Sequence, residues 1–239
     1  MIDVRPASER GRTNWGWLDS RHTFSFGAYC DAAHMGFRAL RVINDDRVLP
    51  GAGFGTHGHR DMEILSFVLE GALEHKDSSG GGGVIRPGEI QLMRAGRGIR
   101  HSEFNHSKDH PLHFLQIWIE PDRSGLPAAY AQKTFDRDRA ARELVLLGSR
   151  DGREDSLQIQ QDVDLWLASI GAGEGREFTV REGRHAWVHV ARGSVALGDV
   201  ELHEGDVELH EGDGASTAGR TSLRFLGRAP SEALVFDLA

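Results

Sequence analysis

Two short stretches of the chain each carry a pair of metal-capable side chains separated by one residue. The first pair is His57 and His59, in GFGTHGHRDMEIL, and the second is His101 and Glu103, in GRGIRHSEFN. Alternate side chains of an extended strand point to the same face, so the members of each pair would point the same way. Two such strands facing each other would bring three imidazoles and one carboxylate to a single point. The spacing therefore predicts a metal site.

Glu63 is the rival for the fourth ligand, because it follows His59 after a short interval that a tight bend could close. Glu103 has the simpler geometry, since it shares a strand face with His101. We therefore predict that Glu63 and Asn105 orient the ligands rather than bind the ion.

Other histidines occur singly in the sequence. Two of them are expected on strands near the site, and their role is left open: His75 and His113. Six more are interpreted as surface residues or as residues with a local partner: His22, His34, His106, His110, His185 and His189.

Three neutral imidazoles and one carboxylate suit a first-row divalent metal ion, and a six-coordinate ion would keep positions for water, substrate or dioxygen. A single carboxylate leaves the ion net positive, so an ionised hydroxyl or enol oxygen of a substrate would bind well. An enzyme would also need a pocket with apolar walls above the metal. The residues predicted to line it, which in such proteins more often form the core, are Phe24, Phe26, Phe54 and Met93.

Short apolar runs separated by glycine must position these side chains. The 239 residues include 30 glycines, and long helical periodicity is scarce. Besides the two metal-bearing stretches, strands are expected at residues 22–29, 37–44, 113–119, 164–170, 186–197 and 233–238. Residues 136–144 are the best helical candidate, although they could equally form a surface turn. The pattern predicts an all-β protein with little helix.

The two halves of the chain have a similar pattern on either side of a linker at residues 120–127, EPDRSGLP. VLEGALE at 68–74 weakly matches VARGSVA at 190–196, and the same offset carries His57 onto Thr179. The second half is therefore predicted to keep the architecture and to lack the metal site.

One heptapeptide is repeated without change: VELHEGD occurs at residues 200–206 and again at 207–213. Its histidines and glutamates could suggest metal binding, but a local tandem duplication explains it better. An odd insertion in one strand would turn every later side chain to the opposite face. We therefore predict a hairpin that pairs VELH with VELH, with residues 204–206 as the turn.

Composition excludes several classes of function. The net charge is −8, the pI is about 5.9 and the basic residues are scattered, so direct nucleic-acid binding is not expected. Cys30 is the only cysteine, which allows no internal disulfide and suits a reducing compartment. No apolar run reaches the roughly 18 residues of a membrane span, and the N-terminal residues are charged. A soluble cytoplasmic protein is expected.

The chain resembles the pirin family of two-domain cupins, and it is especially similar to bacterial pirin-like quercetinases. The first half carries most of the matching strings, which are HTFSFGAY (22–29), MGFRALRVINDD (35–46), GFGTHGHRDMEILSFVLEG (53–71), EHKDSSG (74–80) and AGRGIRHSEFN (95–105). Gly96 departs from the cupin pattern, because many cupins have proline there, and the tandem VELHEGD departs from the family pattern. The resemblance implies His57, His59, His101 and Glu103 as ligands.

The same resemblance implies a bicupin, with two antiparallel β-sandwich or jelly-roll barrels in one chain. Residues 1–125 would form the cupin with the metal site, and residues 126–239 would form a cupin without metal ligands. The implied cofactor is one divalent transition metal, with Fe(II) favoured over Mn, Ni, Co, Cu or Zn.

The implied activity is that of an oxidoreductase, a quercetin 2,3-dioxygenase. It would open the central ring of flavonols with dioxygen and release carbon monoxide, and Glu103 would accept the proton of the 3-hydroxyl. Its partners would be a small aromatic substrate and dioxygen. The alternative is a metal-dependent regulatory protein that binds transcription or metabolic partners, as described for other pirins. A storage or structural cupin is disfavoured by the intact ligand set.

Overall fold

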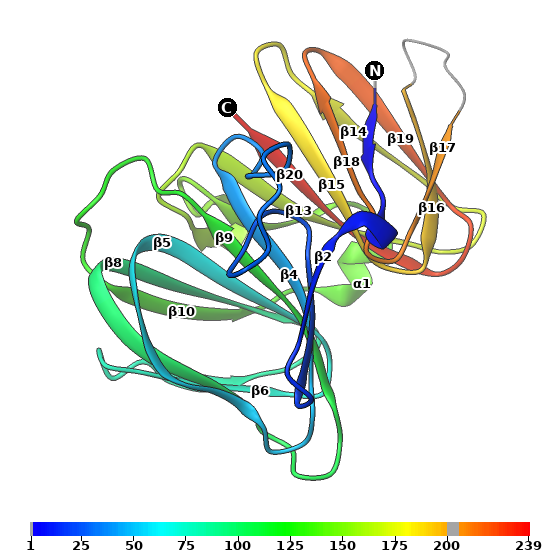
Figure 1. Cartoon of the computed structure of the whole chain (residues 1–239). Helices are drawn as coiled ribbons and strands as arrows, with labels where there is room; N and C mark the ends of the chain where they lie inside the picture. The colour runs from blue at the N-terminus through cyan, green and yellow to red at the C-terminus, as the bar shows by residue number, and fades with distance from the viewer. Residues whose placement is uncertain (1, 200–205) are drawn as a thin grey trace. The chain divides into compact units, whose positions relative to one another are not determined.

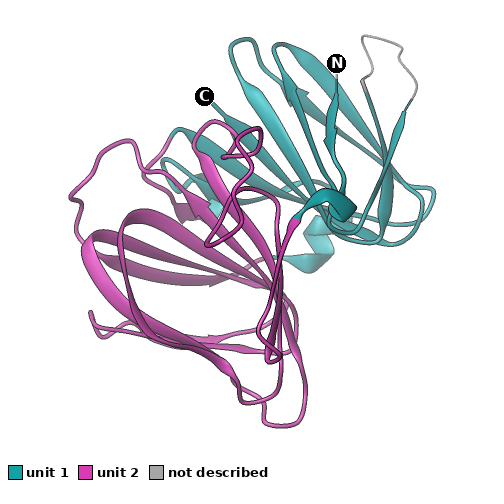
Figure 2. Cartoon of the chain, viewed as in Figure 1, with its two compact units in different colours: residues 1–10, 136–156, 162–239 teal, residues 11–135, 157–161 magenta. Residues whose placement is uncertain are grey.

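The computed structural model describes residues 2–199 and 206–239 of the chain (Figure 1). Strands dominate, and the prediction of an all-β protein with little helix is confirmed. The chain folds into two compact units (Figure 2). Unit 1 consists of Met1–Arg10, Asp136–Ser156 and Asp162–Ala239, and unit 2 consists of Gly11–Phe135 and Leu157–Gln161. The division into cupins at residues 125 and 126 stays a prediction.

Unit 2 is built on one antiparallel sheet. Its strand order is β2-β3-β4-β9-β5-β8-β6-β7, and β10 pairs with β8 as well. The strands of this unit are β2 Gly11–Asn14, β3 Leu18–His22, β4 Leu40–Val48, β5 Gly53–Glu70, β6 Leu73–Asp77, β7 Gly82–Ile85, β8 Glu89–Asn105, β9 Leu112–Ile119, β10 Ala129–Thr134 and β12 Leu157–Gln158.

The two longest strands, β5 and β8, lie side by side in the middle of this sheet (Figure 1). In the second half of β5, residues 64–69 are all apolar except Ser66, and they are buried on both faces of the strand. Gly71 ends the strand with φ 80°, and a Cβ there would lie 2.5 Å from the carbonyl oxygen of Pro111. Only glycine allows the chain to turn so close to its neighbour.

Unit 1 contains two antiparallel sheets. One has the order β1-β18-β15-β20-β13-β11, and the other has the order β14-β19-β16-β17. Apolar side chains of both sheets form one core, with Val188 and Val235 from the first and Leu209 and Leu223 from the second. The strands are β1 Asp3–Arg5, β11 Val145–Ser149, β13 Val163–Ile170, β14 Gly175–Val180, β15 His185–Arg192, β16 Ser194–Asp199, β17 Val207–His210, β18 Gly214–Ala218, β19 Thr221–Gly227 and β20 Ser231–Leu238.

Helical structure is confined to short segments in the described residues. The helix α1 spans Arg137–Ala140, and 3-10 turns span Ala7–Glu9 and Arg153–Asp155. Residues 136–144 therefore combine the two predicted alternatives, because the short helix is followed by a turn at residues 141–142. Asp136 caps α1 by accepting a hydrogen bond from the backbone N–H of Arg139, but the helix ends one turn later. No helix in the described ranges is long and apolar enough to cross a membrane.

Three predicted strands need correction. The strand expected at 22–29 is wrong, because β3 ends at His22 and the loop beyond it makes only a bridge between Phe26 and Tyr29. The strand expected from residue 37 begins at Leu40, after Arg38 adopts a left-handed φ of 54°. The run 186–197 is two strands, because Gly193, with φ 72°, turns the chain between β15 and β16.

Of the tandem heptapeptide, the structure describes the second copy and Asp206, the last residue of the first. Residues 207–210 form β17 and pair with Ser194–Leu197 of β16. Residues 200–205 of the first copy lie outside the described residues, so the predicted hairpin of VELH with VELH falls there too.

Candidate metal centre

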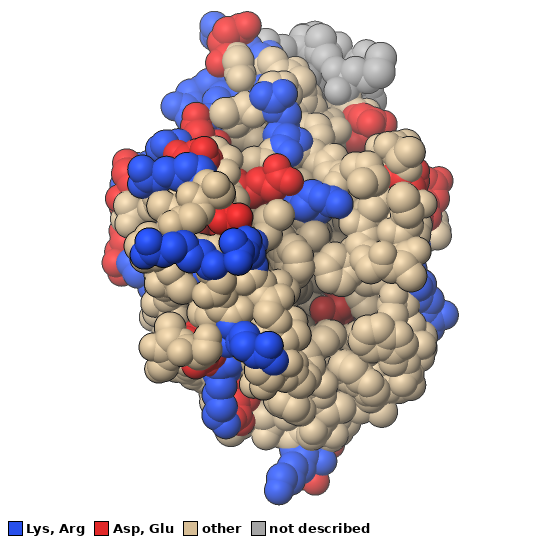
Figure 3. Space-filling view, turned by 60° about the vertical axis from the view of Figure 1, so that its left-hand side comes forward, with Lys and Arg blue, Asp and Glu red and all other residues tan. Residues whose placement is uncertain are grey.

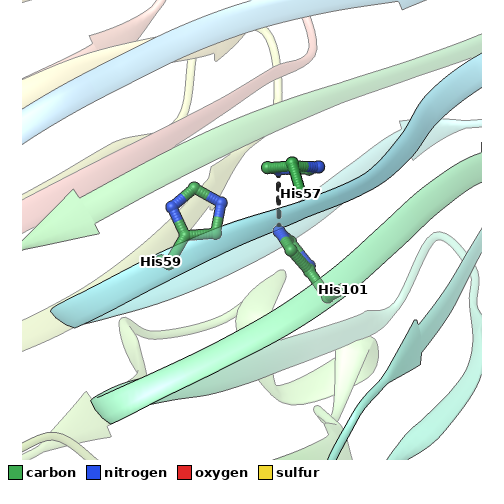
Figure 4. A group of neighbouring side chains, drawn as sticks. All are labelled: His57, His59 and His101. Carbon is green, nitrogen blue, oxygen red and sulfur yellow. Dashed lines mark hydrogen bonds between the residues drawn. The ribbon is translucent and has the colours of Figure 1, made fainter.

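Three imidazoles from β5 and β8 converge inside unit 2. The register of the two strands places His57 directly opposite His101, and His59 is two residues further along β5. Their rings point toward one another (Figure 4), and one ligand nitrogen of each lies within 4.8 Å of the others. Nε2 of His57 and Nε2 of His101 are 3.0 Å apart. The structure thus brings together three of the residues that the sequence predicted as ligands.

The protonation states of these rings favour the binding of a metal ion. Nδ1 of His57 donates to the carbonyl oxygen of Gly55 at 2.8 Å, so its Nε2 lone pair faces the cluster. Burial lowers the pKa of His59 to about 4, with a smaller contribution from the charge of His57. Burial, and then the neighbouring histidines, also lower the pKa of His101 well below its ordinary value. At neutral pH, His59 and His101 are therefore neutral, which is the form that binds metals.

The distances also fit an ion. Two ligands at right angles, each bound at about 2.1 Å, lie about 3.0 Å apart, which is the separation of the His57 and His101 nitrogens. Oε2 of Glu103 is 4.0 Å from Nε2 of His101, close enough for one ion to contact both atoms. The donor set of this centre therefore fits a transition metal ion.

The buried side chain of Glu103 is hydrogen-bonded to one residue of β5 and one of β9. Gln116 donates from Nε2 to its Oε2 at 2.8 Å, and the hydroxyl of Ser66 donates to its Oε1 at 3.4 Å. Burial raises the pKa of Glu103 to about 7, and the charge of Asp46 acts in the same direction. The carboxyl group can therefore gain or lose a proton near neutral pH.

Sequence reasoning missed Ser66 and Gln116, which lie opposite each other in the register of β5 and β9. A signal was present in the sequence. Each is a single polar residue within an apolar run, ILSFVL for Ser66 and FLQIWI for Gln116. Buried polar groups need hydrogen-bond partners, so an isolated polar residue inside a core strand points to a buried partner.

His75 lies on the other side of His101. Its Nδ1 is 3.4 Å from Nδ1 of His101, and its Nε2 is 3.1 Å from Oδ2 of Asp77. Burial lowers the pKa of His75, although the hydrogen bond to Asp77 opposes the shift. The other histidine left open by the sequence, His113, pairs with Asp45 at 2.7 Å.

Two residues predicted to orient the ligands have their hydrogen bonds elsewhere. Glu63 is fully buried and accepts from Nε of Arg94 at 2.7 Å. The amide of Asn105 donates to the backbone oxygens of Val48, Leu49 and His110, and so ties two loops together. Among the described residues, neither forms a hydrogen bond to the imidazoles, and their orienting role stays a prediction.

A cavity of about 470 Å³ opens beside the imidazoles. On the face drawn in Figure 3, an acidic side chain lies at the bottom of a hollow with a mostly uncharged rim. The cavity has aromatic walls and a polar floor. Its aromatic lining is Trp15, Trp17, Phe26, Phe54 and Trp118, and its polar lining includes His22, Asn44, Asp46, His57, His59, Glu103 and Gln116.

Two of the four predicted wall residues, Phe26 and Phe54, therefore line this cavity. The other two do not: Phe24 is buried outside it, and Met93 packs in a core cluster with Ile64. His22, which the sequence placed with the ordinary histidines, contributes to the wall and bonds to Thr13 and Asn44 through its ring nitrogens.

Comparisons with known proteins agree with this picture of the fold. Residues 3–119 match the family model Pirin, and residues 146–238 match the model Quercetinase C-terminal cupin domain. A quercetin 2,3-dioxygenase of Escherichia coli K12 is 44% identical over 238 residues, covering 100% of this chain and 99% of the relative. The crystal structure of YhhW from E. coli has a TM-score of 0.93 at 43% identity, covering 100% of this chain and 98% of that one.

A second crystal structure from E. coli is that of the bacterial pirin YhhW in complex with nickel(II). It has a TM-score of 0.91 at 43% identity, and the match covers 100% of this chain and 99% of that one. The predicted bicupin fold is thereby confirmed.

Proposed function

Because the chain belongs to the pirin family of two-domain cupins, we propose that it is a metal-dependent dioxygenase which opens the central ring of flavonols such as quercetin. A relative with that name matches the whole chain at 44% identity. The ligands would be His57, His59, His101 and Glu103, with Fe(II) as the preferred ion and Ni(II), which a relative binds, as an alternative.

The observation that carries the proposal is the chemistry of the cavity. Its walls are aromatic, while Oδ1 of Asp46 and Oε1 of Gln116 are buried and have no hydrogen-bond partner within the described residues. Buried acceptors without partners are costly, so a ligand that donates hydrogen bonds would be favoured there. A flat aromatic molecule with several hydroxyl groups satisfies both conditions. Its rings would lie against Trp17 and Phe54, and its hydroxyls would reach the acceptors.

Glu103 would accept the proton of the flavonol 3-hydroxyl. In the absence of an ion, burial raises the pKa of Glu103 to about 7, and a bound cation would lower this pKa and favour the ionised form that accepts a proton. Gln116 holds the carboxylate in place. When bound, the ion would supply Lewis acidity toward the ionised hydroxyl oxygen and a path for electrons to dioxygen. The aromatic side chains around the cavity would orient the substrate and exclude water from the ionised intermediate.

The test is to load the purified protein with Fe(II), Mn(II), Ni(II), Co(II), Cu(II) or Zn(II). Quercetin loss and carbon monoxide release are then followed under oxygen. His59→Ala should abolish both, whereas His106→Ala, which removes a half-exposed histidine paired with Glu74, should leave them unchanged. Activity that persists in Glu103→Gln would exclude Glu103 as the base. Absence of turnover with every ion would favour the regulatory alternative.

A further inference from the structure

A row of buried polar groups runs behind the imidazole cluster. Strands β6 and β8 are antiparallel neighbours, and their register places Asp77 opposite His101 and His75 opposite Glu103. The side chains of His75 and Asp77 are fully buried. The row runs from Oδ2 of Asp77 to Nε2 of His75 over 3.1 Å, and from Nδ1 of His75 to Nδ1 of His101 over 3.4 Å.

The hydrogen atoms along this row can be placed from its acidic end. An ionised carboxylate only accepts hydrogen bonds, so Nε2 of a neutral His75 must carry the hydrogen that Asp77 accepts. Nδ1 of His75 is then an acceptor, and Nδ1 of His101 must be the donor. This leaves the lone pair of His101 on Nε2, the atom that lies 3.0 Å from Nε2 of His57.

We propose that His75, oriented by Asp77, is a positioning residue that holds His101 in the Nδ1–H tautomer. The opposite tautomer would turn an N–H group toward the other imidazoles, so its Nε2 could not bind an ion held by His57 and His59. Ligating histidines commonly donate their second nitrogen to a carboxylate or carbonyl, and here a second imidazole lies between the ligand and the carboxylate. The inference rests on the ligand role of His101 in the proposed function, and it assigns His75 no step in the reaction.

The far end of the row is fixed to the backbone. Oδ1 of Asp77 accepts from the backbone N–H and the hydroxyl of Ser79, at 2.8 and 2.6 Å, and from the N–H of Gly81 at 3.1 Å. The ring of Tyr130 stacks on His75, with the centroids 5.1 Å apart and 28° between the planes. His75 therefore cannot turn away from His101 without breaking the turn at residues 77–81 or losing this stacking.

One rival arrangement uses the same atoms. His75, His101 and Glu103 also offer ligand atoms within 4.8 Å of one another, so His75 could be a ligand itself. If the two Nδ1 atoms, 3.4 Å apart, were the ligand atoms, neither would carry a hydrogen, and Nε2 of His101 would point an N–H group at His57. The two arrangements place the hydrogen of His101 on opposite nitrogens, which makes them distinguishable.

The first measurement is the affinity for Co(II), by competition with a chromophoric chelator. His75→Phe keeps a ring against Tyr130 and removes the acceptor, so the affinity should fall about 10- to 100-fold. His75→Gln can accept from His101 through its amide oxygen and donate to Asp77, and should stay within about threefold of the wild type. Tyr130→Phe, the matched control, keeps the stacked ring and should bind as the wild type does. Wild-type affinity in His75→Phe, or an equal loss in His75→Gln, would overturn the proposal.

The second measurement does not depend on any variant folding. In the metal-free wild-type protein, ¹⁵N chemical shifts should show hydrogen-bearing nitrogen at Nδ1 of His101 and bare nitrogen at Nε2. Hydrogen on Nε2 would refute the proposal directly. Neither measurement uses quercetin, so a protein with this tautomer but without turnover would refute only the dioxygenase activity.

Discussion

The buried ion pair between Glu63 and Arg94 allows a sharp test of how β5 and β8 are held together. The two residues are opposite each other in the register, at 2.7 Å, with Glu63 fully buried and Arg94 15% exposed. Arg94→Met removes the cation and leaves the carboxyl group with only the weak N–H···O contact from Gln160 at 3.4 Å. Breaking a buried pair in this way costs about 3–5 kcal/mol.

The loss should depend on pH. Burial already raises the pKa of Glu63 above its ordinary 4.5, against the opposing effect of Arg94, and the variant removes that opposition. A carboxyl group with a raised pKa in the folded state contributes most to stability below its unfolded pKa, and the contribution is lost as pH rises through the folded pKa. In Arg94→Met, the free energy of unfolding should therefore fall by up to about 1.4 kcal/mol per pH unit above pH 4.5.

Urea denaturation between pH 4.5 and pH 8 measures this slope. The double variant Glu63→Gln/Arg94→Met is the control, because it removes the titrating group and should abolish the extra slope. A loss below about 1 kcal/mol at pH 7, or the same slope in both variants, would refute the reasoning. Glu63→Gln also separates two roles of Glu63. If Glu63 orients the ligands, the variant should bind Co(II) more weakly, and if Glu63 only pairs with Arg94, its Co(II) affinity should be unchanged.

Three further predictions concern the site. Gly53→Ala should weaken Co(II) binding at least tenfold, because its Cβ would lie 2.3 Å from the backbone oxygen of Glu103, whereas Gly55→Ala, with nothing within 4 Å, should have little effect. Trp15→Ala, at a residue that is 62% exposed but lines the cavity, should raise the KM for quercetin and leave the melting temperature unchanged. Removing the ion with a chelator should lower the melting temperature, because a free ion concentration of 100 times Kd stabilises the folded protein by about 2.7 kcal/mol. A melting temperature that does not depend on the metal would contradict ligation by the folded state.

Strand alternation was enough to identify the three converging imidazoles. His57 and His59 share a face of β5 for local reasons, and the same rule selects His101 and Glu103 on β8. The residues around them depend on which strands are neighbours, which alternation does not encode. His75 reaches His101 because β6 pairs with the edge of β8 that β5 leaves open, a non-local choice.

The cavity wall was harder to predict for a related reason. Apolar runs that are buried on both faces contain no polar alternation to show which side faces a ligand. Met93 therefore looked like a wall residue, although it packs with Ile64 in the core. Phe24 and Phe26 were assigned to one strand, but the chain leaves β3 at His22, and only Phe26 reaches the cavity from the loop.

The threading of the chain through its two units determines when each unit can be completed during synthesis. Unit 2 includes residues 157–161, whose backbone N–H at Gln160 reaches Glu63, and unit 1 includes β1, which pairs with β18. A growing chain that has emerged from the ribosome as far as Phe135 still lacks residues 157–161, the last segment of unit 2. At roughly 5–20 residues per second, this piece follows a few seconds later. During that interval the unfinished unit, with the carboxyl group of Glu63 not yet covered by residues 157–161, is the form that a nascent-chain chaperone would meet.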